Sequence, residues 1–340
     1  MATIKDVATR AGVSISTVSY ALSGVRSISP EKKSLIEAAM NELDYKPHAI
    51  ARSLASKHTK IIALLFSAVE RGLGLSELTL IMKAAKTATK AGYHLVLWSL
   101  QTNDTQELRE LILQELVDGV LLMEVHNNDP RISLLYEKKI PFFLFGRDES
   151  YSENFVDIDF SATMEAALTY LIRLGHHTIC FLNQSEKTLK SGYGPVVRTH
   201  ESFIALSKSL HIQGYEKFCE PNAKTGLEVV QGLLTETPDI TAFIVMNDNI
   251  ISSVIKGIEE NDFRIPEDKS IVALFSSASL ASLFIPPITT FEMDGGLMME
   301  TAIGQLISKI EKKETEKKQQ LIPCKLIERG SSGSIGGKQV

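Results

Sequence analysis

The chain has 340 residues, of which 44% are hydrophobic and 23% are charged, as in an ordinary globular protein. At roughly 150 residues per domain, this length favours two or three domains. The longest apolar runs, such as Ile61–Phe66, are far shorter than the roughly 20 residues that a membrane-spanning helix needs. The first residues lack the apolar core of a signal peptide, so we expect a cytoplasmic protein with no membrane contact.

The three cysteines do not form a recognisable site. Cys180, Cys219 and Cys324 contain no CxxC pair and no even-numbered framework. We therefore expect small buried residues in a reducing compartment, and neither disulfides nor a cysteine metal site.

Charge is distributed unevenly along the chain. The overall net charge is −5, but residues 1–60 contain nine Lys or Arg and only five Asp or Glu. The first 60 residues therefore carry +4, and the remaining 280 residues carry −9. A basic segment on an acidic body is typical of a small domain that binds a polyanion, although a solvated basic surface would give the same count.

The first 45 residues predict three short helices. Apolar residues recur at helical spacing from Ile4 to Ala11, and Gly12 ends that helix. A second helix is expected from Ile15 to about residue 22. Ser29 and the following proline open a third. Two short helices joined by a glycine-containing turn form the helix-turn-helix arrangement. The expected buried face of the third helix is Leu35, Ile36, Ala39, Met40 and Leu43.

The second of these helices has the residues of a DNA reader. Residues near the amino end of a recognition helix reach base edges, and short hydroxyls can bind the phosphate backbone. Ser16 suits either a donor or an acceptor edge, and Ile15 suits a thymine methyl group. An ordinary solvated helix face would show the same outward residues. The predicted DNA-contacting residues of this segment are Thr3, Ser14, Ile15, Ser16, Thr17, Ser19 and Tyr20.

From Thr3 to about Phe66 the chain resembles the LacI/GalR family of bacterial transcription regulators. The motifs that carry the resemblance are IKDVA, AGVS, TVS, LDYKP and ARSLA. The resemblance implies a repressor that binds a palindromic double-stranded DNA operator as a homodimer under the control of a small-molecule effector. It places Ile15, Ser16 and Tyr20 at base-reading positions. Family members often carry Arg or His at the position of Tyr20, so the operator sequence is not predicted.

Residues 47–60 form the predicted hinge between the headpiece (residues 1–46) and the body. The segment is rich in good helix formers but only about two turns long, and so short a helix is marginal in water. The resemblance implies that a pair of such helices folds on DNA and enters the minor groove. Leu54 would then wedge between base pairs, and Arg52 would reach the groove or a phosphate. The alternative is a flexible tether with no role in DNA binding.

From residue 61 onward, short apolar runs alternate with helical stretches, such as residues 78–90, 164–174 and 249–260. This βαβ pattern predicts an α/β body with parallel sheets covered on both faces. The resemblance continues here and implies a periplasmic-binding-protein-like body of two Rossmann-like subdomains, with chain crossings near Ser161, Thr290 and Leu321. The expected strands are residues 61–66, 94–98, 119–123, 142–145, 178–182, 242–246 and 271–275.

The domain boundaries that we expect follow from these elements. The effector-binding and dimerisation domain spans residues 61–330. Its first subdomain comprises about residues 61–160 and 291–320, and its second about residues 161–290 and 321–330. The Gly- and Ser-rich residues 331–340 are expected to form a disordered tail.

Ligands in such folds bind outside the carboxyl ends of the strands. Family members that bind sugars or purines usually place an aspartate where this chain has Phe275, which can stack on a ring but cannot accept hydroxyl hydrogen bonds. We therefore expect plain sugars to bind weakly, although the effector is expected to be a sugar or related metabolite. The family's arginine aligns with Arg198 or with Thr199. The predicted effector-binding residues, each of which could instead cap a loop, are Leu73, Gly74, Glu124, Arg147, Arg198, Asp248 and Phe275.

The sequence contains no GxSxG, HExxH or P-loop motif, so we expect no enzyme activity, no metal and no cofactor. Asp157 and Asp159 lie two residues apart and could pass for paired carboxylates, but we assign them no catalytic role. The rival hypothesis is a solute-binding or sugar-processing protein whose first sixty residues are incidental.

Overall fold

The computed structural model describes residues 2–23, 26–45, 58–66, 74–101, 104–151, 153–313 and 318–335. The predicted hinge residues Arg52 and Leu54, and Leu73 of the predicted effector site, lie outside these ranges. Within the described ranges, no helix is both long and apolar enough to cross a membrane.

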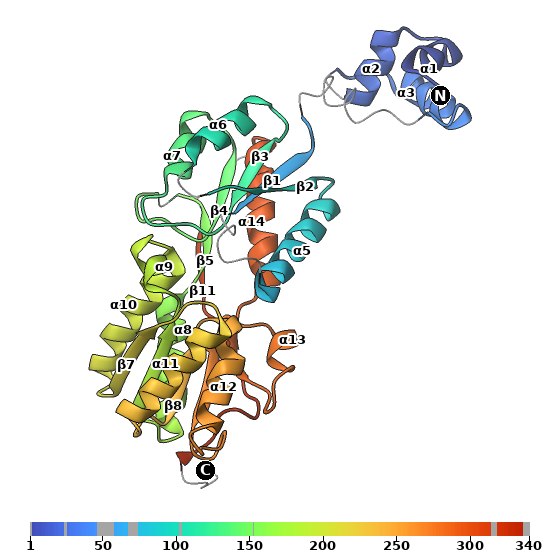
Figure 1. Ribbon diagram of the computed structural model, residues 1–340. Helices are drawn as coiled ribbons and strands as arrows, with labels where there is room; N and C mark the ends of the chain where they lie inside the picture. The colour runs from blue at the N-terminus through green and yellow to red at the C-terminus, as the bar shows by residue number, and fades with distance from the viewer. Residues whose placement is uncertain are drawn as a thin grey trace.

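The headpiece consists of three helices that lie apart from the body in Figure 1: α1 (Ile4–Ala11), α2 (Ile15–Ser23) and α3 (Pro30–Glu42). Thr3 and Asp6 form a capping box at the start of α1, and Gly12 ends this helix with φ +64°. The small core of the headpiece is built from buried side chains of all three helices and the residues around them, namely Val7, Ala8, Ala11, Val18, Ile36, Ala39 and Tyr45.

The sequence predicts one more buried residue on α3 than the structure shows. Ile36 and Ala39 are buried and Met40 and Leu43 are partly buried, but Leu35 is 50% exposed. Three short helices cover only a narrow stripe of α3, and Leu35 lies beside that stripe.

The first subdomain contains a parallel sheet in the order β11-β5-β4-β3-β1-β2. Its central strands are buried almost throughout, so both faces need covering helices. Helices α5 (Leu75–Lys90) and α14 (Gly295–Ile310) cover one face, and α6 (Thr105–Leu113) and α7 (Pro130–Glu137) cover the other (Figure 1). The strands are β1 (Ile61–Phe66), β2 (His94–Ser99), β3 (Gly119–Leu122), β4 (Phe142–Phe145), β5 (Phe155–Ile158) and β11 (Gln319–Ile322).

The second subdomain repeats this plan with the order β12-β10-β9-β8-β6-β7, in which only β12 is antiparallel to its neighbour. Helices α8 (Phe160–Arg173) and α10 (Gly194–Ser209) pack on one face, and α11 (Ala223–Glu236) and α12 (Ile251–Glu259) on the other. The strands are β6 (Thr178–Asn183), β7 (Gln213–Phe218), β8 (Ala242–Val245), β9 (Ser270–Leu274), β10 (Thr289–Glu292) and β12 (Lys325–Ile327). The short helices are α9 (Glu186–Lys190), η1 (Asp248–Ile250) and α13 (Ala278–Ala281).

The predicted fold class is confirmed. The chain crosses between the subdomains three times, after β5, after β10 and after β11. One cluster of buried side chains runs through both subdomains, from Ile62 and Leu64 of the first to Ile179 and Phe181 of the second. The two sheets therefore share a continuous apolar core on the side of the crossings.

The prediction of a disordered tail is wrong for residues 331–335. Ser331 is fully buried; its hydroxyl donates to the carbonyl of Ile271 and accepts from the amide of Thr289. The Ile335 amide donates to the carbonyl of Leu174 at 3.1 Å. Gly and Ser are common in flexible segments, but here the absence of large side chains lets the backbone fit against β9 and β10.

The side chain of His176 forms a hydrogen bond with the same segment, residues 331–335. Its Nε2 donates to the carbonyl of Gly333 at 3.0 Å, whereas Nδ1 has no hydrogen-bond partner among the described residues. Burial lowers the pKa of His176 from 6.5 to about 4. The unfolded chain therefore holds this proton more tightly than the folded chain between these two values, so His176 makes the protein less stable as pH falls through that window.

We expect His176 to account for a loss of about 2 kcal/mol in the free energy of unfolding between about pH 7.5 and about pH 5. Urea unfolding of the wild type and of His176→Gln at both pH values measures this loss in the free energy of unfolding. Gln keeps a donor for the Gly333 carbonyl but does not titrate. An equal pH dependence in the two proteins would contradict the assignment.

DNA-binding headpiece and candidate effector cavity

The start of α2 presents a cluster of hydroxyl groups. The Ser14 hydroxyl accepts from the Thr17 amide at 3.1 Å and lies 2.8 Å from the hydroxyls of Ser16 and Thr17. Ser14 and Ser16 are exposed, and Ile15 is 47% exposed. Free N–H groups, hydroxyls and an exposed apolar side chain at one helix end suit phosphate and base contacts together.

The structure also shows the positions of three further residues that we predicted to contact DNA. Ser19 and Tyr20 are half-buried on α2, and Thr3 is exposed at the start of α1, where it bonds to Asp6. The Arg26 guanidinium lies 5.4 Å from the centre of the Tyr20 ring. In the sequence, Arg26 is only one of the basic residues of the headpiece, and nothing in its spacing indicates that it stacks on Tyr20.

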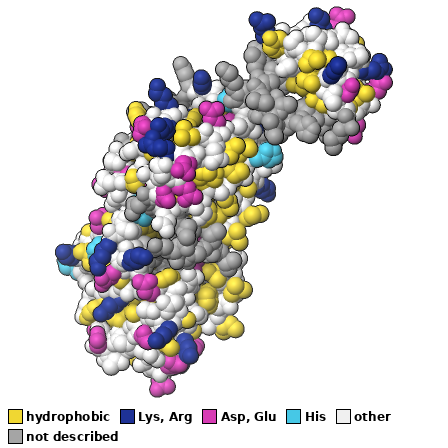
Figure 2. Space-filling model, turned by 45° about the horizontal axis from the view of Figure 1, so that its top comes forward, with side chains coloured by type: hydrophobic (Ala, Val, Ile, Leu, Met, Phe, Trp, Pro, Cys, Tyr) yellow, Lys and Arg dark blue, Asp and Glu magenta, His cyan; other side chains and the backbone are white. Residues whose placement is uncertain are grey.

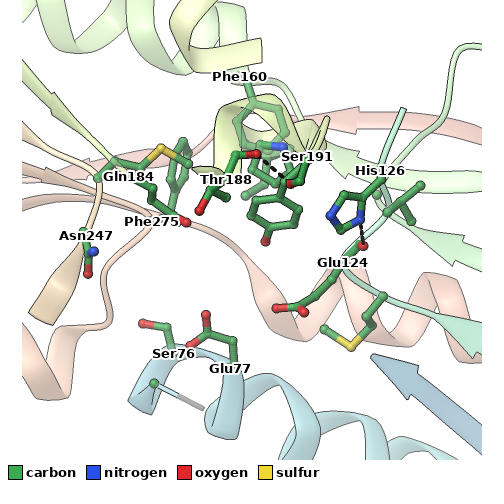
Figure 3. A pocket seen from close by; sticks show the side chains of 18 of the residues that line it. Ser76, Glu77, Glu124, His126, Phe160, Gln184, Thr188, Ser191, Asn247 and Phe275 are labelled. Carbon is green, nitrogen blue, oxygen red and sulfur yellow. Dashed lines mark hydrogen bonds between the residues drawn. The ribbon is translucent and has the colours of Figure 1, made fainter. Parts of the chain in front are cut away.

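A cavity of about 830 Å³ lies between the two subdomains and is lined from both (Figure 3). Its size suits a small molecule. Four of the predicted effector-site residues line it: Gly74, Glu124, Asp248 and Phe275. Glu124 follows β3, Asp248 follows β8 and Phe275 follows β9, so the cavity lies at the carboxyl ends of the strands.

The other two predicted residues with described positions, Arg147 and Arg198, are not among the side chains that line the cavity. Arg198 is 6% exposed; its Nη2 donates to the carbonyl of Arg147 at 2.6 Å. Both guanidinium groups approach Asp157, with Arg198 Nη1 at 3.7 Å and Arg147 Nε at 3.8 Å from Asp157 Oδ2. Thr199, the alternative to Arg198, is fully buried and bonds to its own helix.

Asp157 itself lines the cavity and is 4% exposed. Burial raises its pKa to about 6, against the opposing effect of Arg198 and Arg147. Its Oδ2 receives no hydrogen bond from the described residues. Asp159 plays a different role: its carboxylate accepts a hydrogen bond from the Ala162 amide and caps the start of α8. The two carboxylates therefore do not form a pair.

Phe275 occupies the end of β9 with φ +63°, a left-handed conformation that is uncommon for a bulky residue. Its ring meets Phe160 edge to face, with centroids 5.3 Å apart. Glu124 also has a positive φ, +52°. Non-glycine residues in this conformation cluster at functional sites, and here both side chains line the same cavity.

Contacts between the subdomains border the cavity. The Ser76 hydroxyl of α5 donates to Asp248 of η1 at 3.1 Å. Backbone bonds join Asn127 to Gly192 and Gly194 to Val125. Burial raises the pKa of Asp248, and the nearby Glu77 raises it further. The strand-end rule does not indicate Ser76 and Glu77, because they lie just inside α5, about ten residues beyond the end of β1.

Two parts of the chain match family models. Residues 3–48 match that of bacterial regulatory proteins of the lacI family, and residues 168–332 match the periplasmic binding protein-like domain. The HTH-type transcriptional repressor PurR of Shigella dysenteriae serotype 1 (strain Sd197) is 30% identical over 340 residues, covering 97% of each chain. The repressor of the same name from Escherichia coli O139:H28 (strain E24377A / ETEC) gives the same identity and coverage.

Solved structures share the fold. The lac repressor dimer bound to operator and the anti-inducer ONPF is similar with a TM-score of 0.81 and 23% identity, over 98% of this chain and 99% of that chain. The transcriptional regulator CelR in complex with cellobiose is similar with a TM-score of 0.71 and 22% identity, over 97% and 100%.

A helix-turn-helix headpiece on a two-subdomain α/β body with a cavity at its centre defines a DNA-binding transcription regulator and not an enzyme. Together with the full-length similarity to the PurR repressors, these features assign the chain: it belongs to the LacI/GalR family of bacterial transcription regulators.

Proposed function

We propose that the protein is a cytoplasmic repressor that binds a palindromic operator as a homodimer and is controlled by a small molecule in the cavity. The observation that carries this proposal is the presence, on one chain, of an exposed recognition-helix end and a ligand-sized cavity lined by both subdomains. A twofold protein fits a twofold DNA site, with half-sites roughly 10–10.5 bp apart or a close variant.

An exposed apolar face on the body supports the dimer. Figure 2 shows hydrophobic side chains gathered along one long edge of the body, and in Figure 1 α5, β2 and α13 lie along one side of it. Apolar surface of this kind on a soluble domain marks an interaction site. The residues that define this apolar face are Leu78, Met82, Leu97, Leu283, Ile285 and Leu297.

The cavity is placed to control the headpiece. A ligand that contacts both subdomains favours one orientation of them, and the bond between Ser76 and Asp248 shows that the two sides of the cavity already meet. The hinge segment leads directly into β1 of the first subdomain. The orientation of the first subdomains in a dimer therefore sets the separation of the two hinges and headpieces.

The test is a gel shift with inverted repeats selected from random duplex DNA. We expect the full chain to bind a selected repeat about 1,000-fold or more tightly than random duplex. A variant lacking residues 1–60 should bind neither. Equal binding by both proteins would reject the repressor in favour of the solute-binding alternative.

A further inference from the structure

The last residues before β1 are attached to the body by one buried carboxylate. Asp118, whose side chain is 5% exposed, accepts hydrogen bonds from the amide of Thr59 at 2.7 Å and from the amide of Lys60 at 2.9 Å, one at each carboxylate oxygen. The Thr59 hydroxyl donates to the same carboxylate at 3.0 Å, and His58 Nδ1 lies 3.6 Å from it. Charge-assisted bonds to two successive amides fix the direction of the backbone at that point as well as its position.

Lys60 adds a second attachment. Its ammonium group donates to the hydroxyl of Tyr93 at 3.0 Å and to the carboxylate of Glu311 at 3.3 Å, and it lies 4.3 Å from the centre of the Tyr93 ring. The backbone of Lys60 has φ +56°, a left-handed conformation that is uncommon outside glycine. Such a conformation persists only where the surrounding contacts hold it. The chain therefore enters the body through a bend that these contacts maintain.

The groups that hold the end of the hinge come from distant parts of the first subdomain. Asp118 directly precedes β3, Tyr93 directly precedes β2, and Glu311 is the C-cap of α14. These three residues, together with Thr59 and Lys60, are called the hinge anchor below. Because every element of the hinge anchor belongs to the first subdomain, we expect the end of the hinge to follow any movement of that subdomain.

Helix α14 connects the hinge anchor with the cavity. It begins two residues after Met293, which lines the cavity, and it ends beside Glu311. In Figure 1, α14 runs along the first subdomain from the side of the second. A Cβ added to Gly119, the residue after Asp118, would lie 2.9 Å from Ile310 Cδ1, so the last turn of α14 packs directly against the start of β3. Packed elements therefore join the cavity wall to the end of the hinge.

We infer that Asp118 and Glu311 are positioning residues for operator binding. Through Thr59 and Lys60 they fix the point and the direction in which each hinge leaves the body, and so they set the half-site spacing that the dimer accepts. A loosely attached hinge would let two headpieces reach half-sites at several spacings, whereas a fixed one favours a single spacing. This inference rests on the proposed function, because it assigns the residues that position the headpieces of the same repressor.

The test compares binding of the full chain to the selected inverted repeat and to repeats with one or two base pairs inserted at the centre. Each insertion moves one half-site by about 3.4 Å and rotates it by about 35°. We expect the wild type to prefer the selected spacing by about 100-fold. In Asp118→Asn this preference should fall by about tenfold, because an amide has one acceptor oxygen for the two backbone N–H groups. Lys60→Met combined with Glu311→Gln removes the second attachment and should also lower the preference.

The preference is a ratio of affinities, so it cancels any change that acts on all DNA alike, such as the loss of a negative charge. Asp104→Asn is the matched control. The Asp104 carboxylate also accepts from an amide of the first subdomain, that of Glu107 at 2.9 Å, but it does so at the start of α6 and not at the hinge. This variant should keep the wild-type preference. Thermal unfolding of the same samples measures the stability of each variant.

A wild-type preference in both anchor variants would overturn the inference, even with a lower Tm, because the contacts would then stabilise the fold without positioning the hinge. So would a wild type that binds all spacings equally. Binding of the wild type to its selected repeat and to random duplex decides the repressor proposal separately. A chain that discriminates between those two, but whose anchor variants keep the spacing preference, remains a repressor and loses only the positioning role of Asp118 and Glu311.

Discussion

Replacing Leu54 by Ala is expected to weaken binding to the specific operator by about 10- to 100-fold while leaving the dimer intact. The resemblance to the LacI/GalR family implies that Leu54 wedges between base pairs and stabilises the kinked DNA on which two hinge helices fold. If it does, loss of the wedge removes contacts that exist only in the specific complex. A titration of labelled operator, with random duplex as the comparison, measures the effect, and sedimentation confirms the dimer.

Leu113→Ala is the matched control, because Leu113 is an exposed leucine of the body, 69% accessible on α6, and has no predicted DNA contact. Its operator affinity should equal that of the wild type. If Leu54→Ala also binds like the wild type, residues 47–60 are a tether and the hinge assignment is wrong.

The second large effect concerns the apolar face. Met82→Glu combined with Leu97→Glu places two charges on α5 and the edge strand β2, where the wild-type side chains are 63% and 49% exposed. If a second copy covers this face, the charges are desolvated without partners and the dimer dissociates. Because two linked headpieces bind far more tightly than one, operator affinity should fall by about 100-fold or more.

Light scattering after gel filtration gives the mass of each variant. Leu113→Glu carries the same kind of change on α6, which covers the other face of the sheet, and should remain a dimer with wild-type operator affinity. A double variant that is still dimeric would place the interface elsewhere on the molecule.

The sequence predicted the strands that are apolar runs and missed those that are not. All seven expected strands are present, with ends within one residue of those observed, because each is a short apolar run between turn signals. Five strands, β5, β7, β10, β11 and β12, were not predicted. None of them is a continuous apolar run, since their sequences are FVDI, QGYEKF, TTFE, QQLI and KLI. Their place in a sheet comes from backbone pairing rather than from an apolar pattern.

The predicted site residues divide in the same way, into those that a local sequence rule locates and those that it does not. The strand-end rule located Glu124, Asp248 and Phe275, since it depends only on where strands stop. It could not show which way a side chain turns. Arg147 follows an expected strand and Arg198 lies on α10, yet both guanidinium groups face the buried Asp157. These contacts join residues about 10 and 40 positions apart, and no local pattern encodes them.

The order of the strands has a consequence for synthesis on the ribosome. Helix α14, with the buried Met298, Ile303 and Leu306, covers the sheet of the first subdomain, and β11 adds the edge of that sheet from residues 319–322. During translation, the five earlier strands of that sheet emerge long before their last cover, and part of their apolar face stays open to chaperones and to aggregation until residues 295–322 have been made. The headpiece, by contrast, has all three of its helices within the first 42 residues and is free to fold as soon as it leaves the exit tunnel.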